Sequence, residues 1–373
     1  MVSQSVSSGI EIAEANSVVV QLMRLSRGWP MKRLAELAGV HPSHVTRVEA
    51  GRLPLAGKPL RDYAQALDCR PELLCVPYRR SPSQGPHFRA NASTAEWKRD
   101  RVLANANIAA MRIGRIVENV DLDPAISLPT LDPDDYATEF GEITVAQVLR
   151  RYWRLSGPIT DLTGLLESAG VFVVADPFSD NDVDAVSLRA NEFHPHVIYI
   201  NRALPADRFR LTLAHELGHL VMDAMTLAHP KEVERRATSF AAEFLAPYAD
   251  IEYDLARVTP RTVHELDELR MRWGVSVPSL VVRAHDRGHL SDYHYRTMFR
   301  ILNETGRAYG DRPGVDREEP RLVGHVLDQL TEAGFNERDL DTITLLTNEE
   351  RIATFGAAQQ QTSEPAPRRL TLV

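Results

Sequence analysis

One short segment restricts the fold of this 373-residue chain more than any other: residues 211–225, LTLAHELGHLVMDAM. Its apolar residues predict a helix that is buried over most of its surface. His215, Glu216 and His219 interrupt the apolar run. Burying two imidazoles and a carboxylate without partners would cost on the order of several kcal/mol. We therefore expect these three side chains to share one chemical role.

The spacing of the three polar residues indicates a metal site. His215 and His219 are four residues apart, so one face of a helix presents both imidazoles to a single ion. Glu216 projects beside them, where a carboxylate acts on a water molecule rather than on the metal. The pattern predicts His215 and His219 as metal ligands and Glu216 as a catalytic residue.

A catalytic zinc ion needs a third protein ligand, and the next predicted helix, PKEVERRATSFAAEFLAP, offers two carboxylates. Glu234 lies about 60° from the centre of the apolar stripe of that helix, and Glu232 about 140°. Glu234 is therefore the predicted third ligand. Asp223 lies about 12 Å further along the helix than His215, so the two residues are too far apart to bind one ion. A hydrogen bond from Asp223 to His219 is the role that remains for it.

Hydrolysis of a peptide bond is the chemistry that such a site favours. Zinc lowers the pKa of its bound water toward 7, and Glu216 is placed to take the proton. The same two-histidine, one-carboxylate set also accepts manganese. The strand predicted in HVIYIN, residues 196–201, is a hypothetical edge for pairing with an extended substrate. The sequence does not choose among four candidates for an oxyanion donor: His194, His196, Tyr199 and His229.

The rest of the chain suggests several units of mainly helical, α+β structure. We expect a flexible tail over 1–16, a five-helix domain over 17–78, a linker and helical connector over 79–143, a peptidase domain with a small β-sheet over 144–306, a helical extension over 307–357, and a disordered tail over 358–373. Proline and glycine residues mark the linker after residue 78, whereas the bounds 144–306 follow from the family resemblance described below.

Charge and cysteine content indicate the compartment and one class of partner. Residues 1–80 contain 11 Lys and Arg against 7 Asp and Glu, a net charge of +4, whereas the remainder contains 32 against 44, a net charge of -12. We call this N-terminal region the head. Its mild positive charge favours binding to a polyanion.

Cys69 and Cys75, with five residues between them, match neither a disulfide framework nor the usual zinc spacing. With no signal peptide or apolar run long enough to span a membrane, we expect a cytoplasmic protein without a membrane partner.

The segments IYINRALPADRFRLTLAHELGHLVMD and EVERRATSFAAEFLAP resemble the ImmA/IrrE family of metallo-endopeptidases, and the likeness extends over roughly 144–306. The resemblance implies a zincin-like domain with His215, His219 and Glu234 as ligands, and activity against repressors that are often helix-turn-helix proteins. This chain departs from many relatives at three positions. It has Asp223 in place of histidine, Arg236 in place of an acidic residue, and Thr238 in place of Asn or Asp.

Residues 17–76, with MKRLAELAGVHPSHVTRVEAG at their centre, resemble the XRE class of helix-turn-helix domains. The resemblance implies DNA binding, with Ser43, His44, Thr46 and Arg47 on the outer face of the recognition helix. Met31 stands where relatives usually carry a polar residue. A protein-interaction module is the alternative for this domain, and a homodimer is expected if it binds a palindrome.

Two functions of different class follow. The first is a zinc-dependent endopeptidase that its DNA-binding head guides to a repressor or antitoxin-like regulator. The second is a DNA-binding transcriptional regulator whose peptidase-like domain senses a metal or another ligand without cleaving. The complete HExxH motif with Glu234 favours the first function, and the basic head together with the altered residues around the metal site favours the second.

Overall fold

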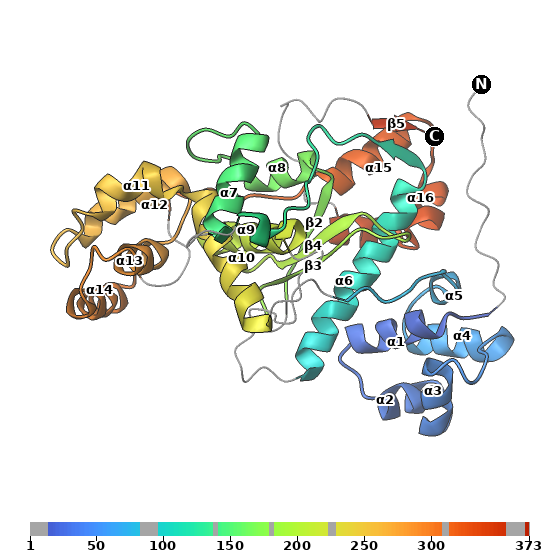
Figure 1. The fold of residues 1–373 in the computed structure, drawn as a ribbon. Helices are drawn as coiled ribbons and strands as arrows, with labels where there is room; N and C mark the ends of the chain where they lie inside the picture. The colour runs from blue at the N-terminus through green and yellow to red at the C-terminus, as the bar shows by residue number, and fades with distance from the viewer. Residues whose placement is uncertain are drawn as a thin grey trace.

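The computed structural model describes residues 14–82, 96–136, 141–178, 183–222, 229–307, 313–355 and 370–372. Within them the protein is mainly helical, with a small three-stranded sheet at the centre of the body, in agreement with the predicted α+β class. The helices of the head lie on one side of this body, and another group of helices projects from the opposite side (Figure 1).

The head contains the five helices that the sequence predicts. Gly28, Gly39 and Gly51 follow the first three helices with φ of 66°, 67° and 66°, a left-handed conformation that glycine adopts without strain. Two free thiols, Cys69 and Cys75, are half-buried against the core of the head. The helices are α1 (Ser17–Ser26), α2 (Met31–Leu37), α3 (Pro42–Glu49), α4 (Gly57–Ala66) and α5 (Pro71–Leu74).

The residues directly before α1 are held in place, so the expectation of a flexible tail over 1–16 is wrong at its end. Asn16 caps α1, and its side-chain amide donates to the carbonyl oxygens of Val76 and Tyr78 at 3.0 and 2.8 Å. The backbone N–H of Ala15 also donates to Leu55. These bonds close the head by joining its two ends. Residues 1–13 lie outside the described residues.

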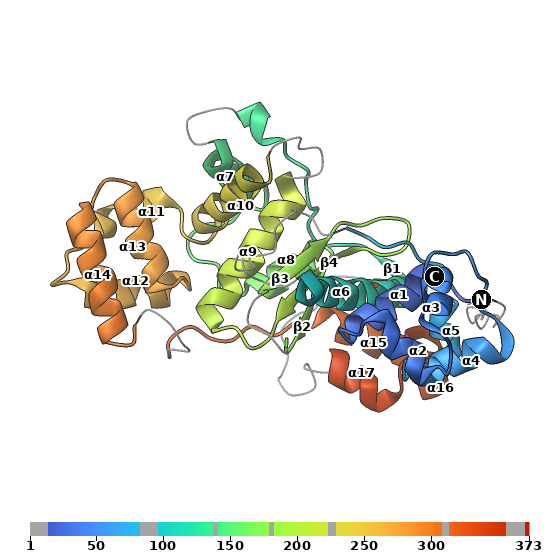
Figure 2. The same cartoon turned by 90° about the horizontal axis from the view of Figure 1, so that it is seen from below.

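A long helix, α6 (Glu96–Val117), connects the head to the body. One side of α6 packs on α1 and contributes Ala104, Ile108 and Met111 to the core of the head. Its other side, which includes Ile113, packs against the central sheet. Two perpendicular views agree on this intermediate position (Figures 1 and 2).

The central sheet has the order β2-β4-β3 and corrects one prediction. Strands β2 (Val171–Asp176) and β4 (His196–Asn201) are parallel, whereas β3 (Ala185–Leu188) pairs antiparallel with β4. The segment HVIYIN is thus the middle strand, and its backbone hydrogen bonds are used on both sides. It is not the free edge that we expected, because a third strand that the sequence did not reveal lies beside it.

The two faces of the sheet are covered by different helices. Ile198 and Ile200 of β4 pack toward α7 (Gly141–Tyr152), α8 (Leu162–Ser168), α9 (Ala206–Met222) and α10 (Pro230–Leu245). Val197 and Tyr199 point to the other face, where α6 and the C-terminal helices lie. The candidate metal helix α9 is therefore separated from the connector α6 by one layer of sheet.

Two further groups of helices complete the fold. The projecting group consists of α11 (Tyr248–Leu255), α12 (Leu266–Trp273), α13 (Val277–Asp286) and α14 (Asp292–Glu304). The C-terminal group consists of α15 (Leu322–Glu332), α16 (Glu337–Thr344) and α17 (Asn348–Phe355). Short 3₁₀ helices cover Pro133–Tyr136 and Val263–Glu265.

The end of the chain forms a strand, so the predicted disordered tail over 358–373 is wrong at Leu370–Leu372. This strand, β5, pairs antiparallel with β1 (Val120–Leu122), directly after α6. The two strands are far apart in the sequence, and each has only three residues, which is too few for a sequence pattern to identify a strand. Most of the expected tail lies outside the described residues.

Candidate metal centre and catalytic residues

Helix α9 places both histidines of the motif on one face, as their spacing predicts. His215 and His219 are each only 1% exposed. Their Nε2 atoms are 3.0 Å apart, and their rings meet edge to face with centroids 4.7 Å apart. The two imidazoles thus point their Nε2 atoms at the same small volume.

Helix α10 supplies a carboxylate to this volume. Oε2 of Glu234 lies 3.2 Å from Nε2 of His215, and Oε1 lies 3.6 Å from Nε2 of His219. The helices approach closely because Gly218 leaves room: a Cβ atom there would stand 3.0 Å from Cδ1 of Phe240. The glycine between the two histidines therefore brings the carboxylate of α10 into reach.

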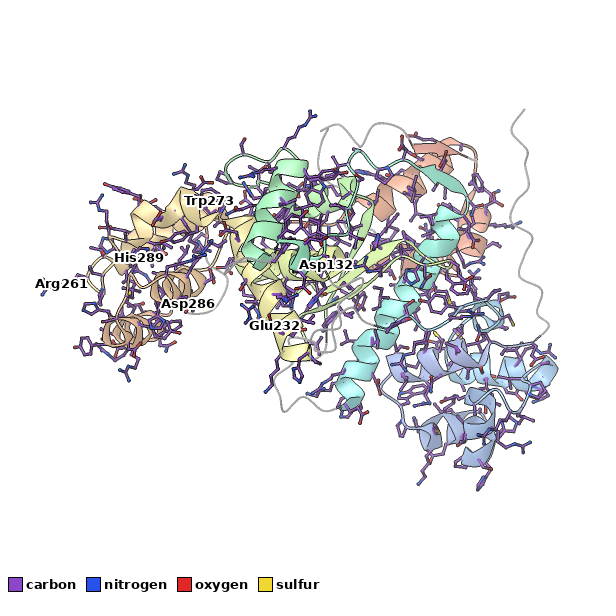
Figure 3. All side chains as sticks on the ribbon, viewed as in Figure 1. Asp132, Glu232, Arg261, Trp273, Asp286 and His289 are labelled. Carbon is purple, nitrogen blue, oxygen red and sulfur yellow. The ribbon has the colours of Figure 1, made fainter. Side chains whose placement is uncertain are left out.

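Glu232, the rival carboxylate, lies in the first turn of α10 (Figure 3) and belongs to an ion-pair cluster. It accepts hydrogen bonds from Arg235 at 2.8 Å and from Arg236 at 3.1 Å. These bonds, first of all the one from Arg235, lower the pKa of Glu232 to about 2. Arg236, which stands where many relatives have an acid, also pairs with Asp134 at 3.3 Å. The structure therefore brings Glu234, and not Glu232, to the histidines.

The three side chains fit a divalent transition metal. Within the described residues, His215, His219 and Glu234 are the one group of three or more His, Cys, Asp or Glu side chains found to be arranged for metal binding, with ligand atoms all within 4.8 Å of one another. Two neutral imidazoles and one carboxylate are a donor set that zinc accepts in catalytic sites. Thr238 adds an outer contact, because its Oγ1 lies 3.4 Å from Nδ1 of His215.

Glu216 lies beside this group and is held by a residue that the sequence did not single out. Its side chain is buried, and its Oε2 accepts a hydrogen bond of 2.6 Å from Oγ of Ser187 in β3. A serine between apolar neighbours in a buried segment was the only sequence signal for this contact. Asp223, the other candidate for a supporting role, lies outside the described residues.

Comparison with known protein families agrees with this geometry. Residues 166–285 match a peptidase-family model described as the IrrE N-terminal-like domain, and residues 20–74 match a model described as helix-turn-helix. The chain joins a helix-turn-helix domain to an IrrE N-terminal-like domain. No curated protein matches the chain. The combination supports a DNA-binding regulator that carries a metallopeptidase-type domain.

The four candidates for an oxyanion donor have different surroundings in the IrrE N-terminal-like domain. The hydroxyl group of Tyr199 donates to Asp176 on the far face of the sheet, so Tyr199 is not available to the metal centre. His229 caps α10 by accepting from the N–H of Lys231 at 3.3 Å. Each of these two side chains thus has a hydrogen-bond partner outside the metal group.

The remaining two candidates lie near the connection between β3 and β4. Nε2 of His194 is 2.8 Å from Oγ of Ser81, in the segment that leaves the head, and His194 is 3% exposed. Nδ1 of His196 accepts from the N–H of Ala190 at 3.2 Å. Burial, and after it the charge of Arg189, lowers the pKa of His196 to about 4. His194 therefore belongs to a domain contact, and His196 stays neutral at physiological pH.

In the helix-turn-helix domain, the four predicted DNA-contacting residues lie on α3, and three of them are exposed: Ser43, Thr46 and Arg47. His44 is half-buried, and its Nδ1 is 2.9 Å from the hydroxyl group of Tyr63 on α4. Thr46 also contacts a neighbouring helix, because its hydroxyl group lies 3.3 Å from Sδ of Met31 on α2. Of the four, His44 is the least exposed.

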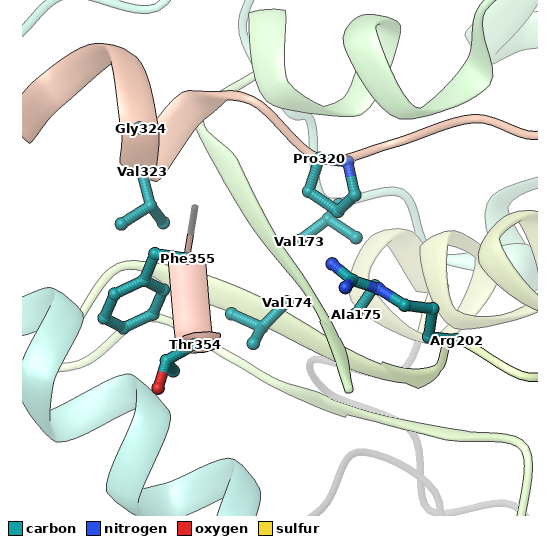
Figure 4. Close-up of a pocket in the computed structure, with 9 residues that line it drawn as sticks. All are labelled: Val173, Val174, Ala175, Arg202, Pro320, Val323, Gly324, Thr354 and Phe355. Atoms are coloured by element: carbon teal, nitrogen blue, oxygen red, sulfur yellow. The ribbon is translucent and has the colours of Figure 1, made fainter. Parts of the chain in front are cut away.

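A small hollow elsewhere in the body is not part of the candidate site. Apolar side chains such as Val173 and Phe355 line most of it, together with Arg202 and Thr354 (Figure 4). It lies between β2 and the C-terminal helices, whereas the metal group lies between α9 and α10.

No helix of the described residues is long and apolar enough to span a membrane.

Proposed function

We propose that this protein is a zinc-dependent endopeptidase whose own DNA-binding domain brings it to a repressor or antitoxin-like regulator, which it cleaves to change transcription. One observation carries the proposal: Glu216 lies buried beside three side chains, His215, His219 and Glu234, whose ligand atoms converge. Manganese fits the same donors. The helix-turn-helix match supports DNA as the second partner.

His215, His219 and Glu234 would hold the ion, which supplies Lewis-acid activation of a water molecule and a carbonyl group. Glu216 would accept a proton from the attacking water and deliver it to the leaving amine, since a carboxylate at that position reaches both. Burial of the two histidines keeps their Nε2 atoms away from competing solvent. Thr238 would hold the ring of His215 by accepting from Nδ1, which fixes the tautomer with a free Nε2.

Metal content of the purified full-length protein tests the ligand assignment. We expect about one zinc ion per chain in the wild type, and at least roughly a tenfold loss of zinc affinity in Glu234→Gln. Glu232→Gln is the matched control on the same helix and should bind zinc as the wild type does. Equal zinc affinity in Glu234→Gln and wild type would contradict the assignment.

A regulator that senses a ligand without cleaving is the second candidate, and one observation favours it. The segment that leaves the head, through Ser81, contacts His194 next to the sheet of the IrrE N-terminal-like domain. A change at the metal site thus has a short route to the head. This function predicts that Glu216→Gln leaves gene regulation unchanged, whereas the first function predicts that regulation is lost.

A further inference from the structure

Ser187 occupies an unusual position for a hydroxyl group. It lies in β3 between Val186 and Leu188, which belong to the core on the far face of the sheet, and it is 0% exposed. Ala185, two residues away and on the same face as Ser187, packs in the core with α9. Buried strand positions favour apolar β-branched side chains, and a buried hydroxyl is unfavourable unless it is hydrogen-bonded. The fold alone does not explain a serine here.

The hydroxyl group of Ser187 is directed at one atom of the candidate site. Its Oγ donates to Oε2 of Glu216 over 2.6 Å, a short bond of the kind formed to a carboxylate. A glutamate side chain has three rotatable bonds, so a carboxylate beside a metal site has several orientations to choose from. The bond to Ser187 fixes one oxygen and leaves Oε1 for contact with water or substrate.

The strand that carries Ser187 is itself firmly placed. Ser187 pairs with Ile198 in the antiparallel ladder to β4, and β4 is the middle strand of the sheet. Arg189, two residues further on, donates to the carbonyl oxygen of Leu220 at 2.6 Å, in the last turn of α9. The end of β3 is thus fastened to the same helix that carries Glu216.

We propose that Ser187 is a positioning residue for Glu216: it holds the carboxylate in the orientation required to accept a proton from the attacking water. This inference rests on the proposed peptidase function. Ser187 does not touch the substrate, and its whole effect passes through Glu216. If Ser187 only satisfied a buried carboxylate, its removal would lower stability without a specific effect at the metal site.

Acetohydroxamate is a suitable probe because it binds an accessible catalytic zinc ion and forms a hydrogen bond with the neighbouring carboxylate. It can be used without knowledge of the natural substrate. Its affinity for the zinc-loaded full-length chain is measured by calorimetry, beside zinc content and the unfolding midpoint. We expect Ser187→Ala to keep zinc but to bind acetohydroxamate roughly tenfold more weakly, as when a hydrogen bond to a charged group is lost. Ser187→Thr, which keeps the hydroxyl group, should restore most of the affinity.

A double-mutant cycle separates positioning from a structural effect. In a Glu216→Gln background, Ser187→Ala should cause no further loss of acetohydroxamate affinity. Ser168→Ala is the control, since the hydroxyl group of Ser168 donates to Gly164 within α8. Wild-type affinity in Ser187→Ala, or the same loss in both backgrounds, would overturn the role of Ser187 alone. No binding of acetohydroxamate by the zinc-loaded wild type would overturn the proposed function and the role of Ser187 with it.

Discussion

The carbonyl oxygen of Phe193 stands where a side chain at Gly114 would begin, 1.9 Å from the position of a Cβ atom. Gly114 is on α6, the helix shared with the core of the head, and Phe193 is in the connection between β3 and β4. The backbone of the IrrE N-terminal-like domain therefore touches the backbone of the connector. Arg189, the first residue of this connection, follows Ser187 by two positions, and Ser187 donates to Glu216, the candidate catalytic base.

Gly114→Ala should destabilise the protein, contrary to the usual effect of alanine in a helix. Alanine in a helix interior is normally favoured over glycine by about 1 kcal/mol. Here the new methyl group would collide with backbone, which cannot rotate away, so we expect the free energy of unfolding to fall by roughly 2 kcal/mol or more. Urea unfolding of the full-length chain measures this change.

Glu118→Ala, at an exposed position just after α6, provides the control for Gly114→Ala. It should alter the free energy of unfolding by no more than about 0.5 kcal/mol. A Gly114→Ala protein as stable as the wild type would mean that α6 and the β3–β4 connection do not meet in this way.

His196 gives the protein a pH-dependent stability. Its pKa is lowered from 6.5 to about 4 by burial and then by the charge of Arg189. Between these two pH values the unfolded chain binds a proton that the folded protein does not, so the free energy of unfolding falls as the pH falls from about 6.5 to about 4. The contribution is at most about 3 kcal/mol.

His196→Gln removes this titration while keeping an oxygen that can accept from the N–H of Ala190. Urea unfolding at several pH values from 7 to 4 should give a smaller decrease in stability for the variant than for the wild type. Parallel pH profiles of the two proteins would show that His196 is protonated equally in the folded and unfolded states.

Arg47 should contribute to DNA affinity through charge. It is exposed on α3, beside Ser43 and Thr46. Arg47→Ala should weaken binding to duplex DNA, and if Arg47 contacts a phosphate it should also lower the slope of affinity against salt by about one ion. Fluorescence anisotropy with host genomic fragments selected by the wild type measures both effects. Arg300→Ala, in the distant helix α14, is the control, and an equal response of the two variants would argue against α3 as the interface.

The sequence was most informative where a local pattern determines the structure. Glycines after α1, α2 and α3 end those helices, and the four-residue spacing of His215 and His219 puts them on one face. The helical angle favours Glu234 over Glu232 as the third ligand, and the Glu234 carboxylate lies 3.2 and 3.6 Å from the Nε2 atoms of the two histidines. In each case the deciding interactions lie within one or two neighbouring helices.

The sequence was least informative where pairing is long-range. β3 has only four residues, and a serine breaks its apolar character, so neither the edge of the sheet nor the contact to Glu216 could be read from it. Strand β5 depends on β1, which lies about 250 residues earlier in the chain. The half-buried state of His44 depends on Tyr63 in another helix. Such contacts are set by the packing of elements, which local periodicity does not encode.

The proposed function depends on cleavage of a regulator by a metal site that uses Glu216. The most direct test compares new protein N-termini across the proteome of the host, with the wild type or Glu216→Gln expressed at equal level and with equal metal content, under normal growth and stress. We expect a short set of termini that is present with the wild type and absent with Glu216→Gln, among them one from a DNA-binding regulator. Identical sets of termini in the two strains would contradict it and would favour a regulator that senses without cleaving.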